Sequence, residues 1–124
     1  MGFIITDFQD ESKSIYTTAW NWGPTVELLK LMNVLDEDRL ELIRYNCGVE
    51  VNTEEARQIA EFIIIQVLSK ITPEERVTYD LKITDEPDDG TFHREDLAKN
   101  YSATYDWLKE FSEFCQTCEG FTVY

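Results

Sequence analysis

The sequence predicts a mainly α protein, a compact helical domain of four to five helices with a minor β element. Several segments repeat apolar residues at helical spacing between capping residues, whereas only residues 77–83 show the two-residue period of a strand. The 124 residues, of which 43% are hydrophobic and 13% aromatic, suffice for one packed core. No internal repeat or low-complexity linker interrupts them, so we expect residues 1–124 to form a single domain.

The first two helices are predicted from a proline and an aspartate. Pro24 stands where a first-turn proline belongs, and apolar residues follow it at Val26, Leu28, Leu29, Leu31 and Met32. Asp36 is predicted to cap a second helix, DEDRLELIRYN, which Gly48 closes.

The third helix is predicted to lie at the centre of the domain. Asn52 and Glu55 have the spacing of a capping box at its start. Apolar residues follow at Ala56, Ile59, Ala60, Phe62, Ile63, Ile64, Ile65, Val67 and Leu68. A helix that is apolar on almost all sides is usually buried. The stretch TPEE, from Thr72, then predicts a short capped turn.

The minor β element is predicted from VTYDLKI at residues 77–83, where apolar and polar residues alternate. FIIT near the start of the chain and FTVY at its end are candidate partner strands.

The last helix is predicted to begin at a Ser102 cap, to run through Cys118 and to end at Gly120. Its apolar face comprises Trp107, Leu108, Phe111, Phe114, Cys115 and Cys118.

The charge balance restricts the partners that the chain can bind. Eleven Lys and Arg residues against 25 Asp and Glu residues give a net charge of −14. Such a surface repels phosphate groups, so we expect no direct binding of nucleic acid or of a membrane. It attracts basic proteins instead, through forces that salt weakens.

The start of the chain and the cysteine count both predict a cytoplasmic protein. MGFIITDF lacks the basic flank and the long apolar run of a secretion signal. Three cysteines, an odd number, suit a reducing compartment better than a disulfide framework.

The thiols are predicted to be reduced and mostly buried rather than catalytic or metal-binding. Cys115 and Cys118 lie near a helix C-terminus, which disfavours a reactive thiolate, and their spacing places both on the apolar face. Together with Cys47 and His93 they lack the paired spacing of a zinc site. We therefore expect no metal and no cofactor.

The segment TDEPDDGTFHRED, residues 84–96, has three interpretations. A calcium loop with Gly90 at its sixth position would place Pro87, which has no side-chain oxygen, at its third position and Asp96 at its twelfth. A catalytic site would pair His93 with a carboxylate, although no nucleophile motif or phosphate loop accompanies it. The remaining interpretation is an acidic turn around Gly90 that meets a basic partner.

Two other features leave alternatives open. A second acidic stretch, Asp36, Glu37, Asp38 and Glu41, is also what the first turn of a helix favours. Trp20 and Trp22 are candidates for either the core or an interface, since both environments favour tryptophan.

Three stretches, NWGPTVELL, PDDGTFHRED and NYSATYDWLKEFSEFC, together resemble a family of small uncharacterised bacterial proteins over most of the chain. At the level of class, the size and acidity resemble the immunity proteins of bacterial toxin systems. That resemblance implies a cytosolic inhibitor that binds and blocks a basic, often nuclease-type toxin.

The sequence therefore favours a non-enzymatic acidic binding protein, an immunity protein that blocks a basic nuclease-type toxin. Its carboxylates would occupy the site where nucleic-acid phosphates would otherwise lie. The predicted partner-binding residues are Asp85, Glu86, Asp88, Asp89, Glu95 and Asp96. The alternative is a small enzyme that uses His93 with nearby carboxylates.

Overall fold

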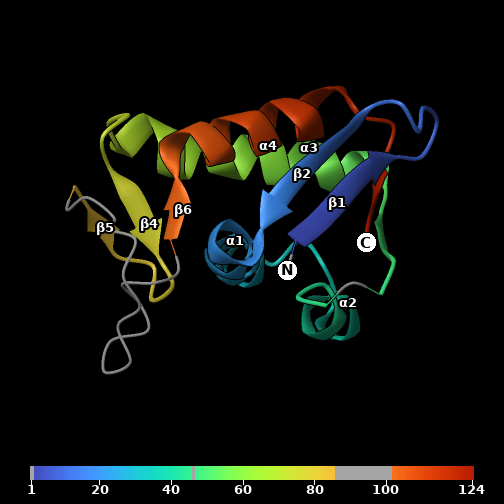
Figure 1. Cartoon of the computed structure of the whole chain (residues 1–124), viewed down its shortest axis with the longest axis horizontal. Coiled ribbons are helices and arrows are strands. Elements are labelled where there is room, and N and C mark those ends of the chain that lie inside the picture. The colour runs from blue at the N-terminus through green and yellow to red at the C-terminus, as the bar shows by residue number, and fades with distance from the viewer. Residues whose placement is uncertain (1, 46, 86–101) are drawn as a thin grey trace.

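The computed structural model describes residues 2–45, 47–85 and 102–124 (Figure 1). Its strands are β1 (Gly2–Asp7), β2 (Ser14–Thr18), β3 (Val49–Val51), β4 (Arg76–Thr78), β5 (Ile83–Thr84), β6 (Ser102–Thr104) and β7 (Phe121–Val123). Its α-helices are α1 (Ala19–Met32), α2 (Glu37–Leu42), α3 (Thr53–Phe62) and α4 (Tyr105–Thr117). A π-helical turn, Ile63–Val67, and a 3-10 turn, Leu68–Lys70, continue α3. The prediction of a mainly α fold is wrong, because the described residues form an α/β fold with a four-stranded and a three-stranded antiparallel sheet.

The four-stranded sheet has the order β2-β1-β7-β3. FIIT and FTVY do form strands, but their predicted pairing with the strand at residues 77–83 is wrong. They pair with each other instead, and Ile5 of β1 lies opposite Val123 of β7. On the other side of β7, Val51 lies opposite Phe121. The strands β2 and β3 were not predicted, because such short segments contain too few residues to establish a period. β3 is a strand because β7, which is distant in sequence, supplies its hydrogen bonds, and β2 is a strand because it pairs with β1 in a hairpin.

The predicted strand at residues 77–83 is a hairpin and not one strand. Its residues divide between β4 and β5, and a tight turn joins the two strands. In that turn the Thr78 N–H donates to the Lys82 carbonyl at 2.8 Å, and Leu81 has a φ of 63°. Apolar and polar residues alternate through the turn as well as along the two strands. This alternation was therefore mistaken for the period of a single strand.

Three of the predicted helix boundaries can be compared directly with the structure. Asp36 caps α2 by accepting from the Arg39 N–H at 2.8 Å, and Asn52 and Glu55 form the predicted capping box of α3. Ser102 does not cap α4: it belongs to β6, and Thr104 is the capping residue.

The other helix boundaries also differ from the predictions. Helix α1 begins at Ala19, so Pro24 lies inside it rather than in its first turn. Helix α2 ends at Leu42, well before Gly48.

The core lies between α1, α3, α4 and one face of the four-stranded sheet, and α3 and α4 run side by side across it (Figure 1). Trp22 is at its centre, only 1% exposed. Its ring centroid lies 5.8 Å from that of Phe3 and 5.7 Å from that of Phe111. Its indole N–H donates to the Ile43 carbonyl at 2.9 Å. Trp22 is therefore a core residue, whereas Trp20 is 45% exposed.

The opposite face of the four-stranded sheet is open to solvent. Alternation along the strands directs Phe3 and Ile5 inward and their neighbour Ile4 outward. We call this surface the open face; its residues are Ile4, Thr6, Ser14, Tyr16, Glu50, Thr122 and Tyr124. None of the helices in the described ranges is long and apolar enough to cross a membrane.

Candidate functional site

The predicted partner-binding loop is only partly within the described residues. Asp85 follows β5 directly and is exposed. The other five predicted residues, Glu86, Asp88, Asp89, Glu95 and Asp96, lie outside the described residues, as does His93. Both interpretations of this loop, the acidic contact surface and the His93 enzyme, therefore stay predictions.

The second acidic stretch forms the start of α2, a helix that buries none of its residues. Asp36, Glu37, Asp38 and Glu41 are all exposed there. Hydrogen bonds from the backbone N–H and then from the side chain of Arg39 lower the pKa of Asp36. These bonds keep the Asp36 carboxylate ionised at the N-terminal turn of α2.

Arg39 is the basic residue of α2, and contacts inside the protein occupy its guanidinium. It donates to both carboxylate oxygens of Glu55, at 2.7 and 2.5 Å, and to the Glu50 carbonyl at 3.1 Å. Its Nε also donates to Asp36 at 2.8 Å. Hydrogen bonds from Arg39 hold the pKa of Glu55 below its ordinary value. The positive charge of Arg39 is thus paired with carboxylates of the same molecule, whereas Glu37, Asp38 and Glu41 face solvent.

A hollow of about 470 Å³ lies between α2 and the end of α1. Its lining residues are Lys30, Glu37, Leu40, Glu41, Arg44 and Tyr45. Both basic residues contact Glu27: Lys30 at 3.3 Å and Arg44 at 3.6 Å. Tyr45 is 58% exposed, and Leu42 beside the hollow is 49% exposed. Tyrosine is enriched at the centres of protein-binding surfaces, whereas charged residues belong to their polar rim.

A third acidic surface runs over the helix pair α3 and α4. Their exposed carboxylates are Glu54 and Glu61 on α3 and Asp106, Glu110 and Glu113 on α4. On the core side, the same helices present apolar residues such as Ile59 and Phe111, both fully buried. The carboxylates are therefore the solvent faces of amphipathic helices. For α3 this corrects the prediction of a helix that is apolar on almost all sides, since only Ala56, Ile59 and Ala60 are buried in it.

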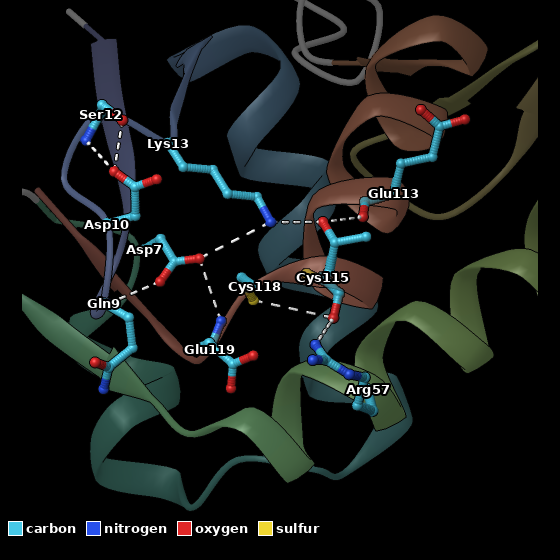
Figure 2. A network of polar contacts seen from close by, with 11 residues as sticks. Asp7, Gln9, Asp10, Ser12, Lys13, Arg57, Glu113, Cys115, Cys118 and Glu119 are labelled. Atoms are coloured by element: carbon cyan, nitrogen blue, oxygen red, sulfur yellow. Dashed lines mark hydrogen bonds and ion pairs between the residues drawn. The ribbon is translucent and has the colours of Figure 1, made fainter.

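A network of polar contacts joins the ends of β1 and α4 (Figure 2). Asp7, only 3% exposed, accepts hydrogen bonds from the backbone N–H groups of Gln9 at 2.8 Å and Glu119 at 3.2 Å. Lys13 lies 3.9 Å from the Asp7 carboxylate and donates to the Thr117 hydroxyl at 2.7 Å. These contacts satisfy a buried carboxylate and fix two turns, which is a structural role.

The two thiols in this region lie in the core. Cys115 and Cys118 are fully buried and free, and burial raises the pKa of each thiol. Arg57 donates to the Cys115 carbonyl at 2.7 Å (Figure 2). The prediction of buried thiols is confirmed for these two residues, whereas Cys47 is exposed. Within the described ranges, no three or more His, Cys, Asp or Glu side chains are grouped as metal ligands.

Comparisons with known proteins do not assign the chain to a family. No family model, no curated protein and no solved structure matched it.

Proposed function

We propose that this chain is a non-enzymatic acidic protein of the bacterial cytoplasm that binds a basic protein partner and blocks it. The partner that fits best is a nuclease-type toxin, whose nucleic-acid site must be positively charged to bind phosphates. The observation that carries the proposal is the imbalance between exposed carboxylates and exposed basic groups, on a chain of net charge −14.

The imbalance is larger at the surface than in the composition. Among the described residues, the exposed carboxylates belong to Asp10, Glu11, Asp36, Glu37, Asp38, Glu41, Glu50, Glu54, Glu61, Glu74, Asp80, Asp85, Asp106, Glu110, Glu113 and Glu119. The exposed basic side chains of the described residues belong to Lys30, Lys70, Lys82 and Lys109. Several basic residues are also engaged by carboxylates, as in the pair of Arg39 with Glu55.

A surface with this imbalance attracts cations over distances comparable to the Debye length, about 10 Å at 0.1 M salt. It therefore speeds encounter with a basic protein and repels a free phosphate backbone. Once bound, its carboxylates would lie where nucleic-acid phosphates lie in the toxin. The two surfaces that we propose for this contact are the loop from Asp85 to Asp96 and α2. Leu42 at the end of α2 and Tyr45 just after it add apolar area to the second surface.

The experiment uses the basic proteins encoded beside this chain. Each is purified, its cleavage of plasmid DNA and of RNA is measured with increasing amounts of the chain, and binding is followed by calorimetry. We expect activity to disappear near a 1:1 molar ratio, and the association rate to fall at least about tenfold between about 50 and about 500 mM NaCl.

The control is polyglutamate at the same concentration of carboxylate, which tests whether any polyanion inhibits the nuclease. The proposal fails if no neighbouring gene encodes a basic protein, if cleavage persists at molar excess of the chain, or if polyglutamate inhibits equally well.

A further inference from the structure

We propose that the open face of the four-stranded sheet is a self-association surface, on which two copies of this chain pack face to face about a two-fold axis. This inference depends on the sheet and not on the proposed binding of a basic partner. It follows from the register of the strands, from the distribution of charge and from the size of the face.

The register gathers the apolar side chains of the open face into one row. Ile4 lies opposite Tyr16 in β2. On its other side Ile4 exchanges both backbone hydrogen bonds with Tyr124, at 2.9 and 2.8 Å. Side chains directly opposite on one face have their Cβ atoms about 4.5–5.5 Å apart. Ile4 is 49% exposed, Tyr16 62% and Tyr124 56%, so the row forms a continuous apolar strip in contact with solvent.

The row beside it is polar but almost uncharged. Thr6 lies opposite Ser14 on one side and Thr122 on the other, and Thr122 lies opposite Glu50. Thr122 is only 8% exposed, so the hydroxyls that can meet the same groups of a second copy across a two-fold axis are those of Ser14 and Thr6.

The Tyr16 ring packs against the backbone of the neighbouring strand. It lies over Gly2, where an added Cβ would collide with the ring. A side chain that is already positioned loses less conformational entropy when a partner packs on it.

The charge distribution favours a second copy of this chain as the molecule that packs on the open face. Glu50 is the single carboxylate among the residues of the open face, which include no Lys or Arg. Two molecules of net charge −14 repel each other through their other surfaces, so they can approach most closely here. A basic partner would find few carboxylates to pair with on this face. Depletion of charge with enrichment of tyrosine is also the composition of interface centres.

The size of the face implies a weak dimer. Four strands about 4.8 Å apart span only about 15–20 Å. An interface of that extent is at the low end of the range for specific contacts, below about 1,200 Å² in total. We therefore expect reversible association with a dissociation constant of about 10–100 μM.

Sedimentation velocity from about 5 to about 500 μM protein, in about 50 and about 500 mM NaCl, tests the inference. We expect the 14.6 kDa chain to become a dimer with rising concentration, and more readily at high salt, because salt screens the repulsion between copies. The proposed binding of a basic partner has the opposite salt dependence, so failure of one proposal is distinguishable from failure of the other. A chain that stays monomeric under all these conditions would overturn the inference.

The variant Ile4→Asp locates the surface, and Ile83→Asp is its matched control. Ile83 is an isoleucine of similar exposure, 48%, on β5 of the other sheet. We expect Ile4→Asp to raise the dissociation constant at least about tenfold and Ile83→Asp to leave it unchanged. If circular dichroism shows that Ile4→Asp does not fold, Tyr16→Asp on the edge strand β2 takes its place. A dimer that survives the open-face substitution, or that Ile83→Asp disrupts equally, overturns the inference.

Discussion

Arg39 of α2 and Glu55 of α3 form a two-point ion pair, with N···O distances of 2.7 and 2.5 Å. The pair joins a helix that buries none of its residues to the central helix of the domain. The Glu55 side chain is only 15% exposed and also accepts from the Asn52 N–H at 3.1 Å. Arg39 thus connects the acidic α2 to the capping box of α3.

Replacing Arg39 by Gln should destabilise the protein by about 1–2 kcal/mol, because the guanidinium bonds are lost while Glu55 stays partly buried. Urea denaturation at pH 7 measures the change. The matched control is Lys82→Gln, which removes the more exposed pair with Asp80, 3.6 Å apart, and should change stability by less than about 0.5 kcal/mol. Equal effects of the two variants would contradict this role of Arg39.

The contribution of Arg39 should also depend on pH. The folded-state pKa of Glu55 is lowered from 4.5 by hydrogen bonds from Arg39. A depressed carboxyl pKa stabilises the fold above the unfolded value and loses that contribution as the pH falls through the folded value. The difference between the wild type and Arg39→Gln should therefore be constant near pH 7 and shrink below pH 4.5. A difference that stays constant down to about pH 3 would exclude Glu55 as its origin.

Phe111→Ala should destabilise the protein by about 3–5 kcal/mol, because a fully buried aromatic ring leaves a cavity. The Phe111 ring stacks on Trp107 with centroids 5.4 Å apart and meets the Phe121 ring edge-on at 6.1 Å. Guanidinium denaturation measures the change, with Lys109→Ala on the exposed side of α4 as the control. A loss below about 1 kcal/mol would mean that this side of α4 is not the core.

Thr25→Val should destabilise the protein by about 1–3 kcal/mol although it preserves the side-chain shape. The Trp107 indole N–H donates to the Thr25 hydroxyl at 2.8 Å, and both groups are buried. Valine leaves that donor without an acceptor. Thr25→Val should cost less stability in a Trp107→Phe background than in the wild type, because the indole N–H donor is already absent there. The double variant should therefore be less destabilised than the sum of the two single variants. Additive effects of the two substitutions would contradict a direct coupling.

Cys47 should react with a thiol reagent at neutral pH far faster than the other two cysteines. It is exposed, whereas burial both shields Cys115 and Cys118 and raises the pKa of each thiol, which keeps them protonated. Stopped-flow labelling of the native protein should show a fast phase of one thiol that Cys47→Ser removes. A fast phase that persists in Cys47→Ser would show that α4 opens readily at its end.

If the proposed partner binding is correct, Asp88→Lys/Asp89→Lys should slow association with the basic partner and leave stability unchanged or slightly higher. The control is Asp106→Lys/Glu110→Lys on α4, which changes the net charge equally. Surface plasmon resonance at low and high salt compares the two variants. Both variants should associate more slowly because their net charge is less negative, an effect that salt screens. The loop variant should associate more slowly still, because it also loses direct contacts with the partner.

Equal association rates for the two charge-reversed variants would mean that the 84–96 loop makes no direct contact with the partner. The variant Glu37→Lys/Glu41→Lys, which reverses two charges on α2, then tests that helix as the contact surface. An exposed Tyr45 lines the hollow next to it.

Capping residues were predictable because their chemistry is local. The oxygens of Asp36 and Asn52 bond backbone groups three residues away, at 2.8 Å in each case, so the sequence spacing alone indicates them. Ser102 has the same chemistry and was wrongly predicted as a cap, since Thr104, two residues later, caps α4. Ser102 cannot cap the helix because its backbone is paired in a strand, β6 with β4. The helix therefore starts after that strand.

The candidate surfaces were predictable in part for the same reason. The exposed carboxylates of α4 follow from amphipathic spacing, and those of α2 from the preference for acidic residues in the first turn of a helix. Asp85 is exposed, and its contact with a partner stays a prediction. The open face was missed. Ile4, Tyr16 and Tyr124 are far apart in sequence and become neighbours only through strand register.

The acidic character of this protein, the amphipathic face of α4 and the caps of α2 and α3 follow from the sequence alone. Each of these depends on residues within about one or two helical turns of one another. Tertiary structure alone decided that segments as short as Val49–Val51 are strands, that Trp22 is buried and that Trp20 is not. The physical reason is that a strand forms its hydrogen bonds with a distant segment, so its stability depends on that partner more than on its own residues.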